Sequence, residues 1–405
     1  MNSHSTLCFI ILLVACLAGV SSDIYAPSLP AIAHDLNAPI DEVQWSMAVF
    51  MLGVSLSQLV YGPISEGIGR KFPLLVGLII AFIGSVICFY AATISVLIWG
   101  RFIQGIGVGA GASLWRAIFR DSFTGETSTK YLAYLAILIT FVVPAAPTLG
   151  GYLSVYFGWR SVFIFLVLYA LITILIVCMG FRETGQYHHK NRLRLSFIFS
   201  SFQQLLSSRI FMGYALCTFL SYGAFFSWYA VGPVLLIKNI GISPVEFGWI
   251  TLLGGGTAMA VAGYLNGKIV SHVGSHFMLR LGWLLMVIAG VLMLAFKFLY
   301  GINIFIIVAP MIVFYFGSTF IWPAAFTGAF APFGKLAGYA SALYSFLQLG
   351  GATVLGSLVA YLPDTDQMPL ACIFIVAPAL AWGIFESVVC LPRAQCYIPA
   401  RNENL

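Results

Sequence analysis

Long runs of apolar residues recur along the whole chain, with short polar breaks between them. A helix needs about 20 mostly apolar residues to cross a bilayer. Only 8% of the 405 residues are charged, whereas a soluble domain carries about 25% to wet its surface. The sequence therefore predicts an all-α polytopic membrane protein with twelve transmembrane helices. The expected spans are 7–33, 43–61, 73–92, 95–115, 131–153, 161–180, 210–236, 246–266, 278–298, 302–325, 337–361 and 368–390.

The Lys and Arg residues are distributed unevenly over the polar breaks. If the N-terminus lies in the cytoplasm, fifteen of them fall in inner breaks, and only Arg160, Lys238 and Lys297 fall in outer ones. Lys and Arg accumulate in cytoplasmic loops, so this asymmetry predicts an even number of spans with both termini in the cytoplasm. Because the basic residues lie in these loops, the net charge of +6 does not indicate nucleic-acid binding.

The longest polar break, from Arg182 to Arg209, divides the spans into six and six. Its basic cluster of Lys190, Arg192 and Arg194 suits the anionic inner leaflet, and an amphipathic segment is expected at 195–206. The predicted domains are a six-helix bundle at 1–181, a cytoplasmic linker at 182–209, a second six-helix bundle at 210–392 and a cytoplasmic tail at 393–405.

Two polar breaks resemble each other at a constant offset of 205 residues. The identities are Gly62 with Gly267, Ile64 with Ile269, Gly69 with Gly274, Phe72 with Phe277, Leu74 with Leu279 and Gly77 with Gly282. An offset near half the chain length predicts two pseudo-symmetric halves in parallel repeat. Transporters that rock one half against the other around a central site have this arrangement.

The eight cysteines and six histidines do not indicate a metal site or a disulfide framework. The cysteines form no C-x-x-C pair and lie mostly in apolar runs, where they behave as small hydrophobic residues. His272 and His276 have a spacing that could hold a metal on a helix, but Gly274 lies between them. The sequence also lacks HExxH, GxSxG and paired intramembrane carboxylates. We therefore expect that the protein is not an enzyme and that it has neither catalytic residues nor a bound metal.

Three segments, at 61–71, 101–107 and 144–151, carry motifs that resemble those of the major facilitator superfamily. Residues 61–71 are similar to its loop signature between the second and third spans, with Glu66 where the family usually has Asp. Residues 101–107 resemble its Arg-x-x-Gln-Gly motif, and residues 144–151 resemble the antiporter motif of drug/proton antiporters. Further similarities, at 23–30 and 159–163, are to the Bcr/CflA drug-resistance subfamily.

The resemblance implies the major facilitator fold and a proton-coupled multidrug exporter of small lipophilic or cationic compounds. It would work by alternating access in the bacterial inner membrane as a monomer, with the proton gradient as energy source and no cofactor. Its partners would be the substrate, protons and the lipid bilayer. The alternative is a dedicated exporter or importer of one metabolite, such as a siderophore or sugar.

The residues assigned to conformational motifs are Gly62, Glu66, Gly69, Arg70, Lys71, Arg116, Pro144, Pro147, Gly150 and Gly151. Ion pairs among Glu66, Arg70 and Arg116 would hold the cytoplasmic side closed.

Asp23 and Arg101 are charged residues within predicted spans. A charge at the centre of a bilayer costs at least about 2.5–3.5 kcal/mol, so such residues normally face a cavity and have a function. We expect Asp23 to carry the coupled proton, and Arg101 to face the cavity, bond to Gln104 or to backbone carbonyls, and tune the protonation of Asp23. Alternatively, Asp23 caps its span at the outer interface and Arg101 snorkels to that interface.

Aromatic stripes on two spans are candidates for a substrate pocket. Tyr222, Phe225, Phe226 and Tyr229 follow the i, i+3, i+4, i+7 pattern of one helix face, and Tyr315, Trp322 and Phe326 form a second stripe. The predicted substrate-binding residues are Tyr222, Phe225, Phe226, Tyr229, Tyr315 and Trp322 from these stripes, together with Tyr25, Gln104 and Gln348. Phe326 is not among them. Such a pocket suits lipophilic cations. Alternatively, the stripes pack against lipid or neighbouring helices.

Overall fold

The computed structural model describes residues 4–184, 195–333, 336–363 and 365–390, which form helices joined by short turns. The predicted basic cluster at 190–194 and the predicted tail at 393–405 lie outside the described residues. In the first half, the helices are α1 (His4–Asp23), η1 (Ala26–Ser28), α2 (Leu29–Asp35), α3 (Ile40–Ile68), α4 (Lys71–Phe89), α5 (Ile94–Ser122), α6 (Gly125–Phe157) and α7 (Arg160–Gly180). They are followed by α8 (Leu195–Leu206), α9 (Arg209–Pro233), η3 (Val234–Ile240), α10 (Pro244–Trp249), η4 (Ile250–Gly256), α11 (Thr257–Val273), α12 (Ser275–Tyr300), α13 (Ile304–Phe330), α14 (Ala337–Ala360), α15 (Met368–Ile384) and η6 (Phe385–Cys390).

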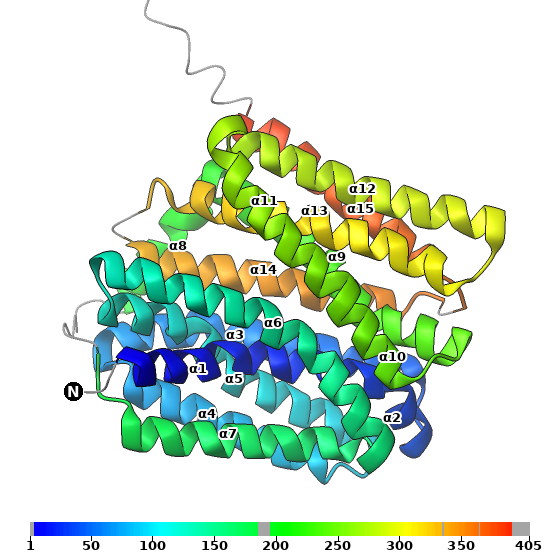
Figure 1. Ribbon diagram of the computed structural model, residues 1–405. Coiled ribbons are helices and arrows are strands. Elements are labelled where there is room, and N and C mark those ends of the chain that lie inside the picture. Colours follow the sequence, from blue (N-terminus) through cyan, green and yellow to red (C-terminus); the bar gives the residue numbers. More distant parts are fainter. Residues whose placement is uncertain (1–3, 185–194, 334–335, 364, 391–405) are drawn as a thin grey trace, which may run out of the picture.

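Twelve segments of the described chain are long and apolar enough to cross a membrane. Each overlaps one of the predicted spans, so the predicted number and order of spans are confirmed. Some spans are composite: α1 continues through η1 into α2, α9 continues into the π-helix η3, and α10 continues through the π-helix η4 into α11. The spans form two bundles of six, α1–α7 and α9–α15 (Figure 1).

The repeated breaks have the same backbone geometry in both halves. Gly69 ends α3 with a φ of 97°, and Gly274, 205 residues later, ends α11 with a φ of 82°. Residues with a side chain rarely adopt such positive φ values, which explains why both positions are glycine. The internal repeat found in the sequence is thus a structural repeat.

The glycines of α5 allow two neighbouring helices to approach it closely. A Cβ at Gly105 would lie 2.2 Å from the carbonyl oxygen of Phe50 in α3. A Cβ at Gly107 would lie 2.1 Å from the backbone nitrogen of Ala81 in α4. Small residues are common where membrane helices pack at short distance, and here they place α5 at the centre of the first bundle.

The two bundles meet differently at the two ends of the molecule. We call the end that carries Arg70 and α8 the linker end, and the end that carries α2 and α10 the far end. At the far end α6 packs on α10, where a Cβ at Gly151 would lie 2.4 Å from the carbonyl oxygen of Pro244. From there α6 and α11 diverge toward the linker end (Figure 1).

On another side of the molecule the bundles stay in contact through α3 and α14. The Ser55 hydroxyl donates a hydrogen bond of 2.8 Å to the carbonyl oxygen of Phe346. Nearer the linker end, a Cβ at Gly62 would lie 3.4 Å from the Cβ of Ala342. The bundles therefore enclose a space that is closed at the far end.

The amphipathic segment predicted in the linker is the helix α8. Phe197 and Phe202 pack their rings on Tyr339 near the start of α14, with ring centroids 5.7 and 5.9 Å apart. Phe199, on another face of α8, is exposed. An exposed aromatic ring on a helix of this kind suits contact with the acyl chains of the adjacent leaflet.

Candidate functional site

A cavity of about 380 Å³ lies between the two bundles. It is lined by α1, α3, α5 and α6 on one side and mainly by α9, α11, α13 and α14 on the other. Its polar and aromatic lining residues are Ser22, Asp23, Phe50, Gln58, Trp115, Arg116, Thr140, Tyr222, Phe225, Phe226, Tyr229, Trp322, Ser345 and Gln348. The volume and the largely apolar lining are typical of a pocket for a small organic molecule.

Asp23 is the last residue of α1 and lines this cavity. Its side chain is nearly buried, and the chain turns directly after it into η1, which contains Pro27. Its carboxyl group interacts with the side chain of Tyr229 on α9, in the opposite bundle, and with the charge of Arg101. Asp23 is therefore a cavity-facing acid at the junction of the two bundles.

Arg101 does not face the cavity, contrary to the sequence prediction. Its side chain is fully buried within the first bundle and is not part of the cavity lining. Its Nη1 donates to the carbonyl oxygen of Ser21 at 3.0 Å and to Oε1 of Gln104 at 2.6 Å. The rings of Tyr25 and Phe50 lie 4.6 and 4.0 Å from its guanidinium carbon. Because Phe50 itself lines the cavity, its ring separates the guanidinium from the cavity, which the sequence pattern does not reveal.

Three predicted substrate-binding residues also lie outside the cavity lining. The Tyr25 hydroxyl is hydrogen-bonded to Ser46 at 2.8 Å, and Gln104 Nε2 donates to Ser85 Oγ at 2.7 Å. Tyr315 lies behind Phe225, with ring centroids 4.6 Å apart. All three predicted residues are buried. They support the cavity wall, because close packing of the helices covers their side chains with neighbouring residues.

The remaining predicted binding residues form the wall contributed by the second bundle. Tyr222, Phe225, Phe226 and Tyr229 of α9, Trp322 of α13 and Gln348 of α14 all line the cavity. The ring of Trp322 lies 5.6 Å from that of Tyr222 and 6.1 Å from that of Phe225. Aromatic pairs at these distances stabilise each other. The first stripe and Trp322 of the second stripe thus form one aromatic surface facing the cavity, whereas Phe326 lines a separate hollow at the linker end.

Several lining residues have no counterpart among the predicted substrate-binding residues. Phe50, Gln58 and Trp115 come from the first bundle, and Ser345 comes from α14. Arg116, which the sequence assigns to a conformational latch, also lines the cavity. The sequence prediction placed Arg116 in the loop after a span at 95–115, but α5 runs to Ser122, so Arg116 lies within the helix. A charge directly after Trp115 in a glycine-rich helix is a signal for a second cavity-facing charge.

Comparison with known proteins assigns the chain to a family. The model of the Major Facilitator Superfamily matches residues 11–388. The chain belongs to the major facilitator superfamily. It is thus a multi-pass membrane transporter of the class that binds small molecules.

Curated relatives of this superfamily member match it over nearly its whole length. It is 29% identical over 398 residues to multidrug resistance protein D of Escherichia coli, covering 97% of this chain and 95% of that protein. It is 26% identical over 389 residues to a bicyclomycin resistance protein homolog of Haemophilus influenzae, covering 93% and 96%. The solved structure of a D-xylose-proton symporter superimposes with a TM-score of 0.74 at 15% identity, covering 94% and 97%. This last likeness concerns the fold.

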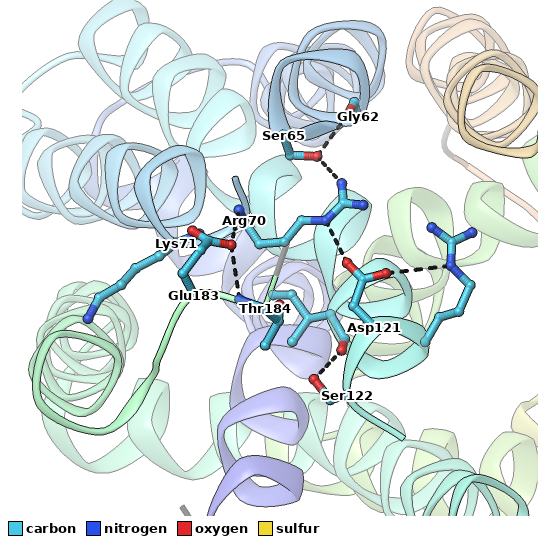
Figure 2. A network of polar contacts seen from close by, with 10 residues as sticks. Gly62, Ser65, Arg70, Lys71, Asp121, Ser122, Glu183 and Thr184 are labelled. Carbon is cyan, nitrogen blue, oxygen red and sulfur yellow. Dashed lines mark hydrogen bonds and ion pairs between the residues drawn. The ribbon is translucent and has the colours of Figure 1, made fainter. Parts of the chain in front are cut away.

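The superfamily loop motif forms a polar network at the linker end (Figure 2). Arg70 Nε contacts Asp121 at 3.0 Å, and Arg70 Nη1 donates to Ser65 Oγ at 2.6 Å. The backbone N–H groups of Arg70 and Lys71 donate to the carboxylate of Glu183 at 2.7 and 3.0 Å. The predicted pairing of Arg70 with Glu66 is replaced by pairing with Asp121, because both Arg70 and Asp121 lie at adjacent helix ends of the first bundle.

Glu66 instead faces the second bundle. A Cβ at Gly338, in the first turn of α14, would lie 2.1 Å from Glu66 Oε1. A negative charge at the start of a helix is favourable because the helix dipole is positive there. Glu66 therefore links α3 to α14 across the boundary between the bundles at the linker end.

The residues of the antiporter motif lie in the first bundle where it meets other helices. A Cβ at Gly150 would lie 1.9 Å from the carbonyl oxygen of Ile24, one residue after Asp23. Gly151 faces Pro244 of the opposite bundle, and Pro144 lines the cavity. Pro147, through its carbonyl oxygen, lies against Gly248 of α10. The motif thus joins Asp23, the cavity and the far-end contact.

Proposed function

We propose that this superfamily member is a proton-coupled exporter of small lipophilic or cationic compounds. The observation that carries the proposal is a cavity with an aromatic wall and one acid, Asp23, placed where the two bundles meet. Aromatic faces bind lipophilic and cationic molecules. If proton and substrate compete for the carboxyl group of Asp23, binding of one releases the other, which couples the two fluxes. The names of the relatives, which denote resistance to bicyclomycin and to multiple drugs, support this substrate class.

In the same proposal the protein is a monomer of the bacterial inner membrane and uses no cofactor and no enzymatic chemistry. The linker end faces the cytoplasm, as the Lys and Arg distribution indicates. The two bundles at 1–181 and 210–392 move as bodies joined by the linker, and the residues of the cavity alternate in access between the two sides. Arg101 acts on Asp23 from behind the cavity wall, through its charge and its bond to Ser21.

Proton release from purified protein tests this proposal. Addition of tetraphenylphosphonium, a lipophilic cation, to protein in weakly buffered detergent solution should release protons in a saturable manner. The Asp23→Asn variant should bind the cation without releasing protons. Proton release that persists in Asp23→Asn would contradict the role of Asp23. A response confined to one sugar or one siderophore across a panel of compounds would favour a dedicated metabolite transporter.

A further inference from the structure

The cavity holds two charges of opposite sign. Among the described residues that line it, Asp23 and Arg116 are the charged ones. The proposed function uses Asp23 and leaves Arg116 without a role at this site. A guanidinium that faces an apolar cavity is costly to desolvate, so it points to a negatively charged binding partner.

Arg116 has no such partner within the described protein. It forms no ion pair or hydrogen bond with any described residue; the ring of Trp115 lies 4.5 Å from its guanidinium carbon, and the Tyr344 side chain is also close enough to interact with its charge. Its side chain is accessible to solvent and yet surrounded by protein, because it lies inside the cleft between the bundles. The five N–H donors of a guanidinium are thus available to a ligand.

The surroundings of Arg116 favour an anion. Arg116 lies between the cavity and a second hollow of about 270 Å³ at the linker end. Arg70 and Arg120 also line that hollow, and both contact the carboxylate of Asp121, at 3.0 and 3.7 Å. The carboxylate of Glu66 also lines that hollow, toward Gly338 of α14, so three guanidinium groups stand against two carboxylates there. A cleft with an excess of one sign of charge concentrates ions of the other sign.

Asp23 and Arg116 lie far apart in the cavity. The helices α1 and α5 run antiparallel, and Val14 of α1 lies against Gly111 of α5. Asp23 is nine residues beyond Val14 toward the far end, and Arg116 is five residues beyond Gly111 toward the linker end. At 1.5 Å per residue the two charges are separated by roughly 20 Å along the helices. A proton on Asp23 and an anion on Arg116 therefore do not compete for one site.

We propose that Arg116 binds a carboxylate group of the substrate, so that the transported compounds include amphipathic carboxylic acids. The apolar part of such a compound packs on the aromatic wall of Tyr222, Phe225 and Trp322, and its carboxylate lies toward the linker end. A planar guanidinium forms paired hydrogen bonds with a carboxylate. This inference rests on the proposed function, because it names a further substrate class for the same cavity.

Two ligands of equal size and different charge test the inference. The dissociation constants of 1-naphthaleneacetate and of its uncharged amide, 1-naphthaleneacetamide, are measured at neutral pH on purified protein in nanodiscs. The wild type should bind the acid about tenfold more tightly, as expected for one charge-assisted interaction. In Arg116→Gln the ratio of the two constants should fall to about one, and in Arg116→Lys it should be intermediate. The control Arg209→Gln removes the same charge at an exposed position that lines neither hollow, and should keep the wild-type ratio.

Other outcomes would overturn the inference. A wild type that does not prefer the acid, or an Arg116→Gln variant that keeps the preference, rules out carboxylate recognition by Arg116. If Arg116→Gln weakens the acid and the amide equally, Arg116 acts on the conformation, as the predicted latch with Glu66 would require. Proton release on addition of tetraphenylphosphonium to the wild type separates the two proposals. If protons are released but the acid is not preferred over the amide, only carboxylate recognition by Arg116 is refuted. If no protons are released but an Arg116-dependent preference for the acid is found, proton coupling is refuted.

Discussion

The most heavily buried charge in the first bundle is held by contacts other than an ion pair. Arg101 donates from Nη1 to Ser21 and Gln104, and the rings of Tyr25 and Phe50 cover its guanidinium. Its Nε and Nη2 are buried and form no hydrogen bond with described residues. Gln104 is therefore important beyond its own packing, because it links Arg101 to Ser85 of α4 through its amide group.

Replacement of Gln104 tests the strength of this buried network. Gln104→Leu keeps the approximate size of the side chain but removes the acceptor for Arg101 and the donor for Ser85. We expect the free energy of unfolding to fall by about 1–3 kcal/mol, since buried polar groups lose a partner. Denaturant unfolding in detergent micelles measures this change. The matched variant Gln203→Leu, at an exposed position of α8, should change it by less than about 0.5 kcal/mol.

At the scale of elements, the start of α4 is capped by a residue distant in sequence. The carboxylate of Glu183, just after α7, accepts hydrogen bonds from the N–H groups of Arg70 and Lys71. The first N–H groups of a helix have no partner within the helix, so this contact satisfies them and places a negative charge at the positive end of the helix dipole. It also ties the beginning of the linker to the loop motif.

We expect Glu183→Ala to loosen the start of α4. Loss of such a cap costs about 1 kcal/mol, so the amides of Arg70 and Lys71 should exchange their hydrogens roughly five times faster if they exchange through local opening. Hydrogen exchange followed by mass spectrometry measures this rate. Peptides from α12, at the equivalent place in the repeat, serve as the internal reference, and unchanged exchange at residues 70–71 would refute the capping role.

Gly69 and Gly274 occupy equivalent positions in the repeat, so comparing their substitutions distinguishes the cost of backbone strain from the cost of a steric contact. Alanine at either position must adopt a positive φ, which costs about 1–2 kcal/mol. A Cβ at Gly69 would also lie 2.5 Å from Glu183 Oε2, whereas a Cβ at Gly274 meets no atom within 4 Å. Gly69→Ala should therefore lower the midpoint of thermal unfolding more than Gly274→Ala does. Equal effects of the two substitutions would show that the contact with Glu183 adds nothing.

At the scale of the whole molecule, the far end is closed by backbone contacts between the bundles. Gly151 of α6 faces the carbonyl oxygen of Pro244, and Gly248 of α10 faces Thr148. The Nε2 of Gln44 in α3 also donates to the carbonyl oxygen of Ala230 at 2.9 Å. Because closely packed interfaces resist gradual deformation, a small added group is expected to shift the equilibrium between whole conformations.

Gly151→Ala should therefore favour opening of the far end. Its added Cβ would lie 2.4 Å from the Pro244 carbonyl oxygen, so the two bundles cannot approach as closely. Spin labels at the exposed positions Phe157 and Lys238 should report a longer distance, and proton-driven efflux should fall at least about tenfold if closure lies on the transport cycle. In Gly263→Ala the nearest atom to the new Cβ is 3.9 Å away, so that variant should keep the wild-type distance.

The sequence by itself determined the membrane spans, their order and the repeat, because the bilayer requires long apolar helices and each break must carry its polar residues. It also identified Asp23 and Arg101 as unusual, because a charge within a membrane span is energetically costly and normally has a function. Which side chains reach the cavity was decided by the tertiary structure. Arg101 and Arg116 lie on the same helix, but the ring of Phe50 covers Arg101, whereas Arg116 lines the cavity. That difference depends on the rotation and packing of neighbouring helices, which local sequence patterns do not specify.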